Sequence, residues 1–308
     1  MNNNPKKNIL FLRTLYVIPF KTLTEVLSNV LTETTWVFTA PDPKDPNKFV
    51  GLEIATADTS RTIYIKVKIP ASEFDVNGYF CKYERFELGI SLHNLYKLLK
   101  SVDKDDILSM YVEENDKQNL IMEIENQDKK SKTYYKLKLM DLDQQQKKTS
   151  KIDFDVKITM PSGEFHKLCR EMNNIAEYVE IKCTSKNIIF TCKGDCAERS
   201  TIYKSEEGGL NISNENKKNQ NIVQGIYELK NIVLFTKCAT LCNDIQIYMK
   251  NDFALTIIYT IATLGTITIA LSPIKEENIK NISYSYSDDE DEVNVIGNTK
   301  QSINYDDD

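Results

Sequence analysis

The sequence predicts an α+β protein built from two topologically similar domains, each with two helices packed on antiparallel sheets. The first observation is periodicity, because four amphipathic helical segments are each followed by runs rich in Ile, Val, Thr and Tyr. The second is repetition at a regular spacing. The leading apolar residues of the four helices are Phe20, Leu92, Phe165 and Leu229, separated by 72, 73 and 64 residues. The third is length, since 308 residues suit two cores of ordinary size.

The four helices are predicted in chain order from their apolar faces and their start signals. The first has its apolar face at residues 20–27, and Pro19, directly before them, is the expected first residue of the helix. The second covers residues 91–100. The third covers residues 164–172 and follows Pro161-Ser162-Gly163, in which Ser162 is the expected cap. The fourth covers residues 228–237.

The two halves also match in detail, which indicates an internal duplication. Leu92-His-Asn-Leu and Lys100 recur 137 residues later as Leu229-Lys-Asn-Ile and Lys237. We therefore expect a first domain at residues 1–140, a polar connector at 141–153, a second domain at 154–276 and a disordered acidic tail at 277–308. The tail holds nine acids and two lysines, or −7, so a chain of net charge −6 leaves +1 for the body.

One uncharged stretch, residues 253–274, is long enough to span a membrane. Threonines alternate with Ile and Leu along it, and Leu264-Gly265 lies near its middle. This pattern predicts two β-strands around a turn, and no membrane role.

The thiols and the missing motifs exclude several function classes. Seven cysteines in a chain without a recognisable secretory leader indicate reduced thiols inside a cell. The pairs Cys192/Cys196 and Cys238/Cys242 have the spacing C-x3-C without a nearby histidine, so we expect no metal. No phosphate-binding loop, dinucleotide fingerprint or hydrolase motif is present. We therefore expect no enzymatic activity and no cofactor.

Basic residues gather on the non-core faces of the predicted helices. Taken singly, each pair would be an ordinary solvated helix face. Recurrence in four related units instead predicts one surface that contacts DNA phosphates without reading sequence. The residues of this predicted surface are Lys21, Lys97, Lys100, Lys167, Arg170, Lys230 and Lys237.

Several strings resemble one known family, the proliferating cell nuclear antigen (PCNA) family of DNA sliding clamps. The resemblance covers about residues 9–276 and combines long strings with the right order and internal duplication. The matching residues are Trp36, Lys136-Leu-Lys-Leu-Met-Asp-Leu-Asp143, Met160-Pro-Ser-Gly-Glu-Phe165, Phe235-Thr-Lys-Cys-Ala and Leu271-Ser-Pro273.

This resemblance implies the DNA clamp fold, in which three subunits close into a ring around duplex DNA. By position, the seven basic residues above match the family's inward-facing residues. The implied partners are duplex DNA, a DNA polymerase, a clamp loader, other proteins with PCNA-interacting motifs and further copies of the chain itself. The implied place is the nucleus or a cytoplasmic viral replication compartment, in a protist or a large DNA virus.

The resemblance also implies two protein-binding surfaces. Ring closure would pair an edge strand near residues 130–138 with one near 196–204, and its candidate residues are Tyr134, Tyr135, Lys136, Arg199 and Ile202. The family's outer partner groove corresponds to Ala57, Thr62, Tyr64, Asp141, Leu142, Asp143, Ala254, Leu271 and Pro273. Lys147, Lys148, Thr149 and Ser150 stand where the family has a Leu-Gly-Ile-Pro run, so we expect a more polar groove.

Three hypotheses remain open at the level of sequence. The first is a homotrimeric processivity clamp. The second is a monomer, or one member of a heteromeric checkpoint-type ring, and the third is a clamp-fold scaffold that binds proteins without DNA. The acidic tail either occupies the basic bore in place of DNA or only adds solubility.

Overall fold

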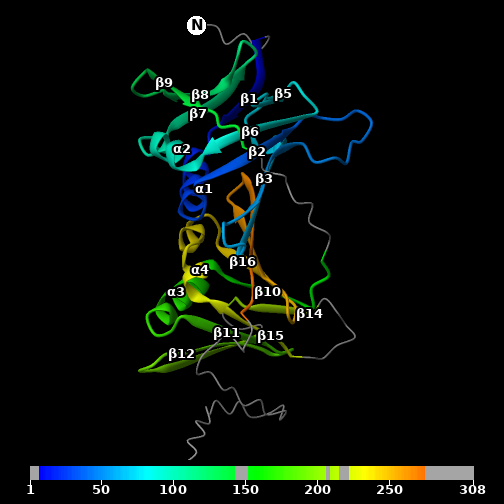
Figure 1. The fold of residues 1–308 in the computed structure, drawn as a ribbon, viewed down its shortest axis with the longest axis vertical. Helices are drawn as coiled ribbons and strands as arrows, with labels where there is room; N and C mark the ends of the chain where they lie inside the picture. The colour runs from blue at the N-terminus through cyan, green and yellow to red at the C-terminus, as the bar shows by residue number, and fades with distance from the viewer. Residues whose placement is uncertain (1–6, 143–151, 206–208, 215–221, 275–308) are drawn as a thin grey trace, which may run out of the picture.

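The computed structural model describes residues 7–142, 152–205, 209–214 and 222–274. Within them the chain forms four α-helices and three antiparallel sheets, with the helices gathered along one side of an elongated molecule (Figure 1). The predicted α+β architecture is confirmed. The predicted tail and most of the predicted connector lie outside the described residues.

The first half of the chain alternates strands with two helices. Its elements are β1 (Asn8–Thr14), α1 (Val17–Val30), β2 (Glu33–Thr39), β3 (Gly51–Ala57), β4 (Ile63–Pro70), the 3-10 helix η2 (Ala71–Glu73), β5 (Tyr79–Cys81), β6 (Arg85–Ser91), α2 (Leu92–Leu99), β7 (Asp106–Glu113), β8 (Asp116–Asn126) and β9 (Ser131–Lys138).

The second half repeats this plan with its own pair of helices. Its elements are β10 (Val156–Pro161), α3 (Ser162–Asn173), β11 (Tyr178–Cys183), β12 (Asn187–Lys193), β13 (Glu198–Lys204), β14 (Asn211–Asn214), β15 (Val223–Glu228), α4 (Leu229–Val233), the 3-10 helix η3 (Thr236–Thr240), β16 (Asp244–Met249), β17 (Leu255–Ile261) and β18 (Gly265–Leu271).

One sheet joins the two halves. A five-stranded sheet (β5-β1-β7-β8-β9) belongs to the first half, and a four-stranded sheet (β13-β12-β11-β15) belongs to the second. A nine-stranded sheet (β14-β10-β16-β17-β18-β4-β3-β2-β6) contains strands of both. Its seam is the antiparallel pair β18–β4, which runs from Thr266 opposite Lys68 to Leu271 opposite Ile63. Buried Ile269 and Ile65 face each other in this seam, so the halves share both a core and a backbone ladder.

The helices form the second layer. α1 packs on α2, and α3 packs on α4, so each half carries one helix pair. α1 also contacts η3, and this contact links the helix layer across the two halves. The helices therefore lie along one side of the molecule (Figure 1).

The helix boundaries differ from the sequence prediction at three places. α1 begins at Val17, and Pro19 is tolerated because a first-turn N–H has no partner within the helix. Ser162 is the first residue of α3 and not its cap, because its backbone N–H donates to Asn243 O at 2.7 Å and the residue is buried. The fourth predicted helix breaks into α4 and η3, where the Thr236 hydroxyl donates to Val233 O at 2.5 Å and competes with backbone bonding.

The uncharged stretch at residues 253–274 forms a hairpin, as predicted. β17 and β18 pair along their length, and Ala262–Leu264 make the turn between them. In the part of the chain that the structure describes, no helix combines the length and apolar character needed to cross a membrane.

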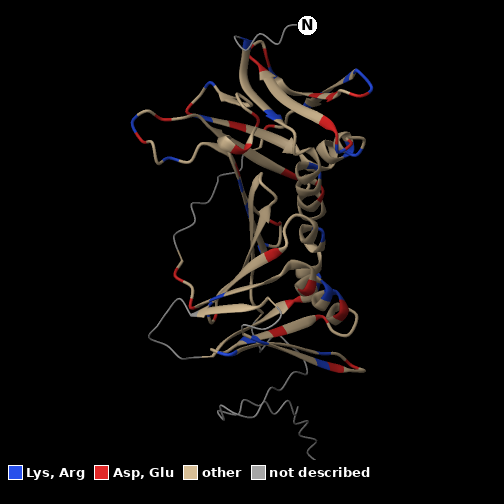
Figure 2. Ribbon diagram, turned by 180° about the vertical axis from the view of Figure 1, so that it is seen from behind, with Lys and Arg blue, Asp and Glu red and all other residues tan. Residues whose placement is uncertain are grey.

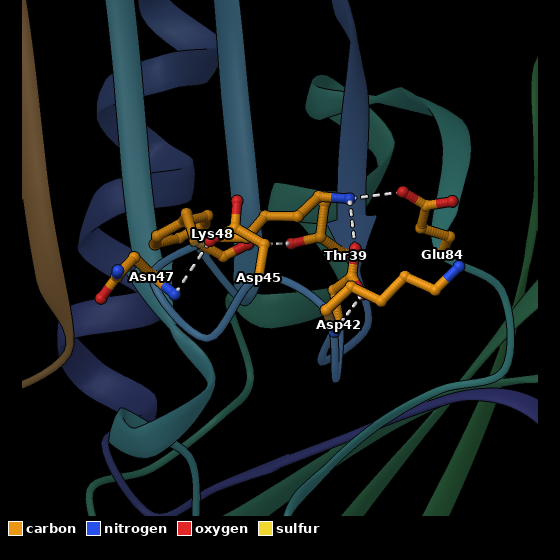
Figure 3. A network of polar contacts seen from close by, with 8 residues as sticks. Thr39, Asp42, Asp45, Asn47, Lys48 and Glu84 are labelled. Atoms are coloured by element: carbon orange, nitrogen blue, oxygen red, sulfur yellow. Dashed lines mark hydrogen bonds and ion pairs between the residues drawn. The ribbon is translucent and has the colours of Figure 1, made fainter.

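The loop between β2 and β3 projects away from the helices (Figure 1) and is held by polar contacts (Figure 3). Lys48 Nζ lies 2.5 Å from Glu84 Oε1 and 3.8 Å from Asp42 Oδ2. Asn47 N donates to Asp45 Oδ1 at 3.2 Å, and Thr39 Oγ1 donates to Phe49 O at 2.9 Å. These contacts fix the loop on the side of the sheets, distant from the basic helix faces.

Candidate nucleic-acid interface

The basic face of α2 is built by its amphipathic pattern. Leu92, Leu95 and Leu99 are fully buried, so the opposite side of the helix faces solvent and carries Lys97, with Lys100 just past its end. Ser91 caps the helix by accepting from Asn94 N at 3.5 Å. The two lysines are three residues apart and project on the same side.

The face of α3 repeats this arrangement in the second half. Phe165, Leu168 and Met172 are buried, whereas Lys167 and Arg170 are exposed. Figure 2 marks basic residues on helices of both halves, along the same side of the molecule. Each half thus presents one pair of exposed cations at a three-residue spacing, on α2 in the first half and on α3 in the second.

These four residues have no close acid partner within the described ranges. Among the described residues, Lys97, Lys100, Lys167 and Arg170 make no ion pair within 4.0 Å. Lys100 Nζ lies 5.2 Å from the centroid of the Tyr96 ring, which leaves its charge available. We call these four residues the free cation set.

The remaining three predicted cations have partners inside the chain. The Lys21 ammonium donates to Lys100 O at 2.7 Å and to Val102 O at 3.1 Å, so it ties α1 to the end of α2. Lys230 lies 3.0 Å from Glu228, and Lys237 pairs with Glu25 of α1. Their contact with DNA stays a prediction, and it would compete with these internal bonds.

Glu25 connects three elements of the helix layer. Burial opposes its ionisation, but hydrogen bonds from Lys237 and Tyr96 outweigh that effect and lower the pKa of Glu25. Burial and the bond to Glu25 raise the pKa of Tyr96 to about 12. The carboxylate therefore stays charged at neutral pH and links α1, α2 and η3.

His166 lies directly below the free cation set, in the core. It is 1% exposed, its Nε2 lies 2.9 Å from Tyr259 Oη, and the two rings stack with centroids 5.6 Å apart. Burial, and then the charge of Arg170, lower the pKa of His166 to about 4. His166 is therefore neutral and contributes no charge to the surface.

The predicted ring-closing strands lie at the edges of two different sheets. β9 ends the five-stranded sheet and β13 ends the four-stranded sheet. Tyr134 on β9 is 55% exposed and Ile202 on β13 is 43% exposed. Two candidates have partners inside the chain: Lys136 pairs with Asp116 at 2.6 Å, and Arg199 pairs with Glu171 at 2.8 Å. Tyr135 is half-buried and packs against the core.

Two family models match the chain, one for each half. The model described as "Proliferating cell nuclear antigen, N-terminal domain" matches residues 20–146, and "Proliferating cell nuclear antigen, C-terminal domain" matches residues 148–274. The chain belongs to the PCNA family. Residues 143–151 lie outside the described residues, so the exact domain boundaries stay a prediction.

Two viral relatives of this PCNA-family chain are named as clamps. "Probable DNA polymerase sliding clamp" of Acanthamoeba polyphaga mimivirus is 31% identical over 236 residues, which is 76% of this chain and 49% of the relative. "Probable DNA polymerase sliding clamp 1" of Paramecium bursaria Chlorella virus 1 is 27% identical over 272 residues, 87% of this chain and 98% of the relative. The chain thus spans about half the length of the first relative and nearly all of the second.

The residues of the predicted partner groove lie in two places, and the groove itself stays a prediction. Ala57 faces Tyr64 across β3–β4, and Tyr64 faces Ala270 across β4–β18, so these residues lie together. Leu142 contacts Gly89 on β6, which β2 separates from β3. Of the other predicted residues, Thr62, Ala254 and Pro273 are half-buried, Leu271 is buried and Asp141 is exposed, while Asp143 lies outside the described residues.

Sequence reasoning missed Glu25, Tyr96 and His166 as parts of this region. Glu25 lies four residues after Lys21 on the same helix side, which was a usable signal. His166 directly follows Phe165 in an apolar helix face, and this position indicates burial. Over the described residues, no group of three or more His, Cys, Asp or Glu side chains is arranged to hold a metal ion.

Proposed function

We propose that this chain is a DNA polymerase sliding clamp, a non-enzymatic processivity factor that encircles duplex DNA as a homotrimeric ring. The observation that carries the proposal is the free cation set, which lies on α2 of one half and α3 of the other, along the helical side of the molecule. Membership of the PCNA family and the names of the viral relatives support it.

The chemistry of the free cation set suits sliding. Lysine and arginine side chains on exposed helix faces contact phosphates through charge, and phosphates repeat along any duplex. Contacts to phosphate carry no sequence information, so binding through the free cation set is expected to be independent of sequence. Loose contacts of this kind hold DNA while allowing movement along it.

The remaining partners follow from the same proposal. A DNA polymerase, a clamp loader and other proteins with PCNA-interacting motifs would bind the outer face of the nine-stranded sheet, around Ala57 and Tyr64. The chain would act where DNA is replicated, in a nucleus or in a viral replication compartment. A monomeric or heteromeric clamp is the alternative, and the mass in solution separates it from the homotrimer.

The test is a charge reversal within the free cation set. The double variant Lys97→Glu, Lys167→Glu should bind a linear duplex about 10- to 100-fold more weakly at low salt, because two phosphate contacts are lost. Each lost contact should also reduce the slope of log affinity against log salt concentration by about 0.9. Fluorescence anisotropy across a salt series measures both quantities. The matched control is Lys44→Glu in the β2–β3 loop on the sheet side, which should leave both unchanged.

Equal DNA affinity of the double variant and the unaltered chain would contradict the proposal. That result would favour a clamp-fold scaffold that binds proteins without DNA. Either conclusion requires that the double variant unfolds at the same temperature as the unaltered chain. This is expected, because Lys97, Lys167 and the control residue Lys44 are all exposed.

A further inference from the structure

The free cation set lacks close acid partners in the described chain. Glu25 pairs with Lys237, Glu171 with Arg199, and Glu228 with Lys230. Glu25 and Glu171 also interact at longer range with the free cation set, Glu25 with Lys100 and Glu171 with Lys167 and Arg170, and exposed Glu164 lies on α3. Among the described residues none of these acids forms an ion pair within 4.0 Å with the set, so its four charges can bind a further anion.

A concentrated source of negative charge lies at the end of the same chain. Residues 277–308 carry −7, and five consecutive acids stand at Asp288, Asp289, Glu290, Asp291 and Glu292. We call residues 288–292 the acidic run. Closely spaced carboxylates resemble a phosphate backbone in their charge density, so they suit the same cations.

The described chain ends close to the helical face. Ile274 N donates to Ile226 O at 2.8 Å, and Ile226 lies in β15, which runs directly into α4 at Leu229. Three residues of backbone span at most about 10 Å, so the tail begins near the helix layer. The acidic run follows fourteen residues after Ile274, a reach of up to about 45–50 Å. Because α3 packs on α4, the tether is long enough to bring the acidic run to α3.

We propose that the acidic run binds the free cation set when DNA is absent, and that duplex DNA displaces it. This inference rests on the proposed function, because it makes the tail a competitor for the same surface. A tethered segment acts at an effective concentration in the millimolar range, so weak charge contacts are enough for occupancy. The tail would oppose unproductive DNA contact and give way where DNA is threaded through the ring.

The first test needs no DNA. A zero-length carbodiimide cross-linker joins carboxylates to amines that touch, and mass spectrometry of the full chain then locates the bonds. Links from the acidic run to Lys97, Lys100 and Lys167 are expected, and they should disappear at high salt. Links spread equally over exposed lysines such as Lys44, or no links from the tail, would overturn the proposal.

The second test compares duplex affinity between the full chain and a tail-neutral variant. The variant carries Asp288→Asn, Asp289→Asn, Glu290→Gln, Asp291→Asn and Glu292→Gln. It should bind a linear duplex about 10-fold more tightly at low salt, and the gain should vanish at high salt. The control removes five exposed acids elsewhere, as Asp→Asn at Asp105, Asp128, Asp153, Asp195 and Asp252, and should show a much smaller gain.

The outcomes separate this inference from the proposed function. If both tail forms bind DNA with equal affinity, the tail inference fails and the clamp stands. If the control variant gains as much as the tail-neutral variant, the effect is general charge and the tail inference also fails. If neither form binds DNA, the clamp proposal fails, and the cross-links alone decide whether the tail lies on the helices.

Discussion

His166 shows how one buried side chain is kept neutral beneath a charged surface. Its neighbour in sequence, Lys167, points to solvent, whereas His166 points into the core and meets Tyr259. Its folded pKa of about 4 lies below its ordinary value of 6.5, because burial disfavours the imidazolium. As pH falls from 6.5 towards 4, the unfolded chain binds the proton first, so the folded state loses stability.

The prediction at this position concerns the pH dependence of unfolding. The contribution of His166 is complete above pH 6.5 and decreases by about 2–3 kcal/mol on going down to pH 4.5. His166→Gln retains a partner for the Tyr259 hydroxyl and cannot titrate, so its unfolding free energy should fall less over this range. Urea denaturation at both pH values measures the difference. An equal decrease in variant and unaltered chain would assign the pH dependence to other groups.

At the scale of elements, the helix layer is held together across the two halves by Glu25. This residue of α1 receives Lys237 of η3, while Lys21 of the same helix bonds the end of α2. Charges that would otherwise belong to the predicted DNA surface therefore stabilise helix packing.

The corresponding prediction is that Glu25→Gln lowers the unfolding free energy at pH 7 by about 1 kcal/mol, because the pair is partly buried. The folded pKa of Glu25 is below its ordinary value of 4.5, so this stability is present above that pH and is lost as pH falls through the folded pKa. The gap between variant and unaltered chain should therefore narrow as the pH is lowered below 4.5. Glu164→Gln on exposed α3 is the control and should have no measurable effect at either pH.

The same elements show what the sequence could predict. The prediction of α2 was accurate, because a serine cap and three leucines at helical spacing are local signals. The break between α4 and η3 depends on one hydroxyl bond that no periodicity contains. The engagement of Lys21 and Lys237 was not predictable either, since their partners lie 79 and 212 residues away. Local pattern located the basic residues, and only the fold decides which of them are free.

For the whole molecule, two of the sheet edges, β9 and β13, are the predicted sites where one copy would join the next. β9 and β13 each present an open backbone edge with an exposed apolar side chain, Tyr134 or Ile202. Copies joined in a head-to-tail manner would cover both edges and close if the rotation allows it.

The prediction is a mass in solution of about three times 35.5 kDa, measured by light scattering after size exclusion. Ile202→Asp places a charge at the joint and should shift the mass towards 35.5 kDa, while Val76→Asp, in a loop where Val76 is 94% exposed, should not. An unaltered chain that already has the single-chain mass would rule out the homotrimer and favour the monomeric or heteromeric clamp.

The seam between β18 and β4 has a consequence for covalent connectivity. Six residue pairs, from Thr266–Lys68 to Leu271–Ile63, join the halves without any help from the connecting peptide. A backbone cut within residues 143–151 would leave this ladder and its buried isoleucines in place, so we expect the two fragments to remain bound. The unbroken polypeptide is then one way of making this subunit, and a gene divided at that point would be another.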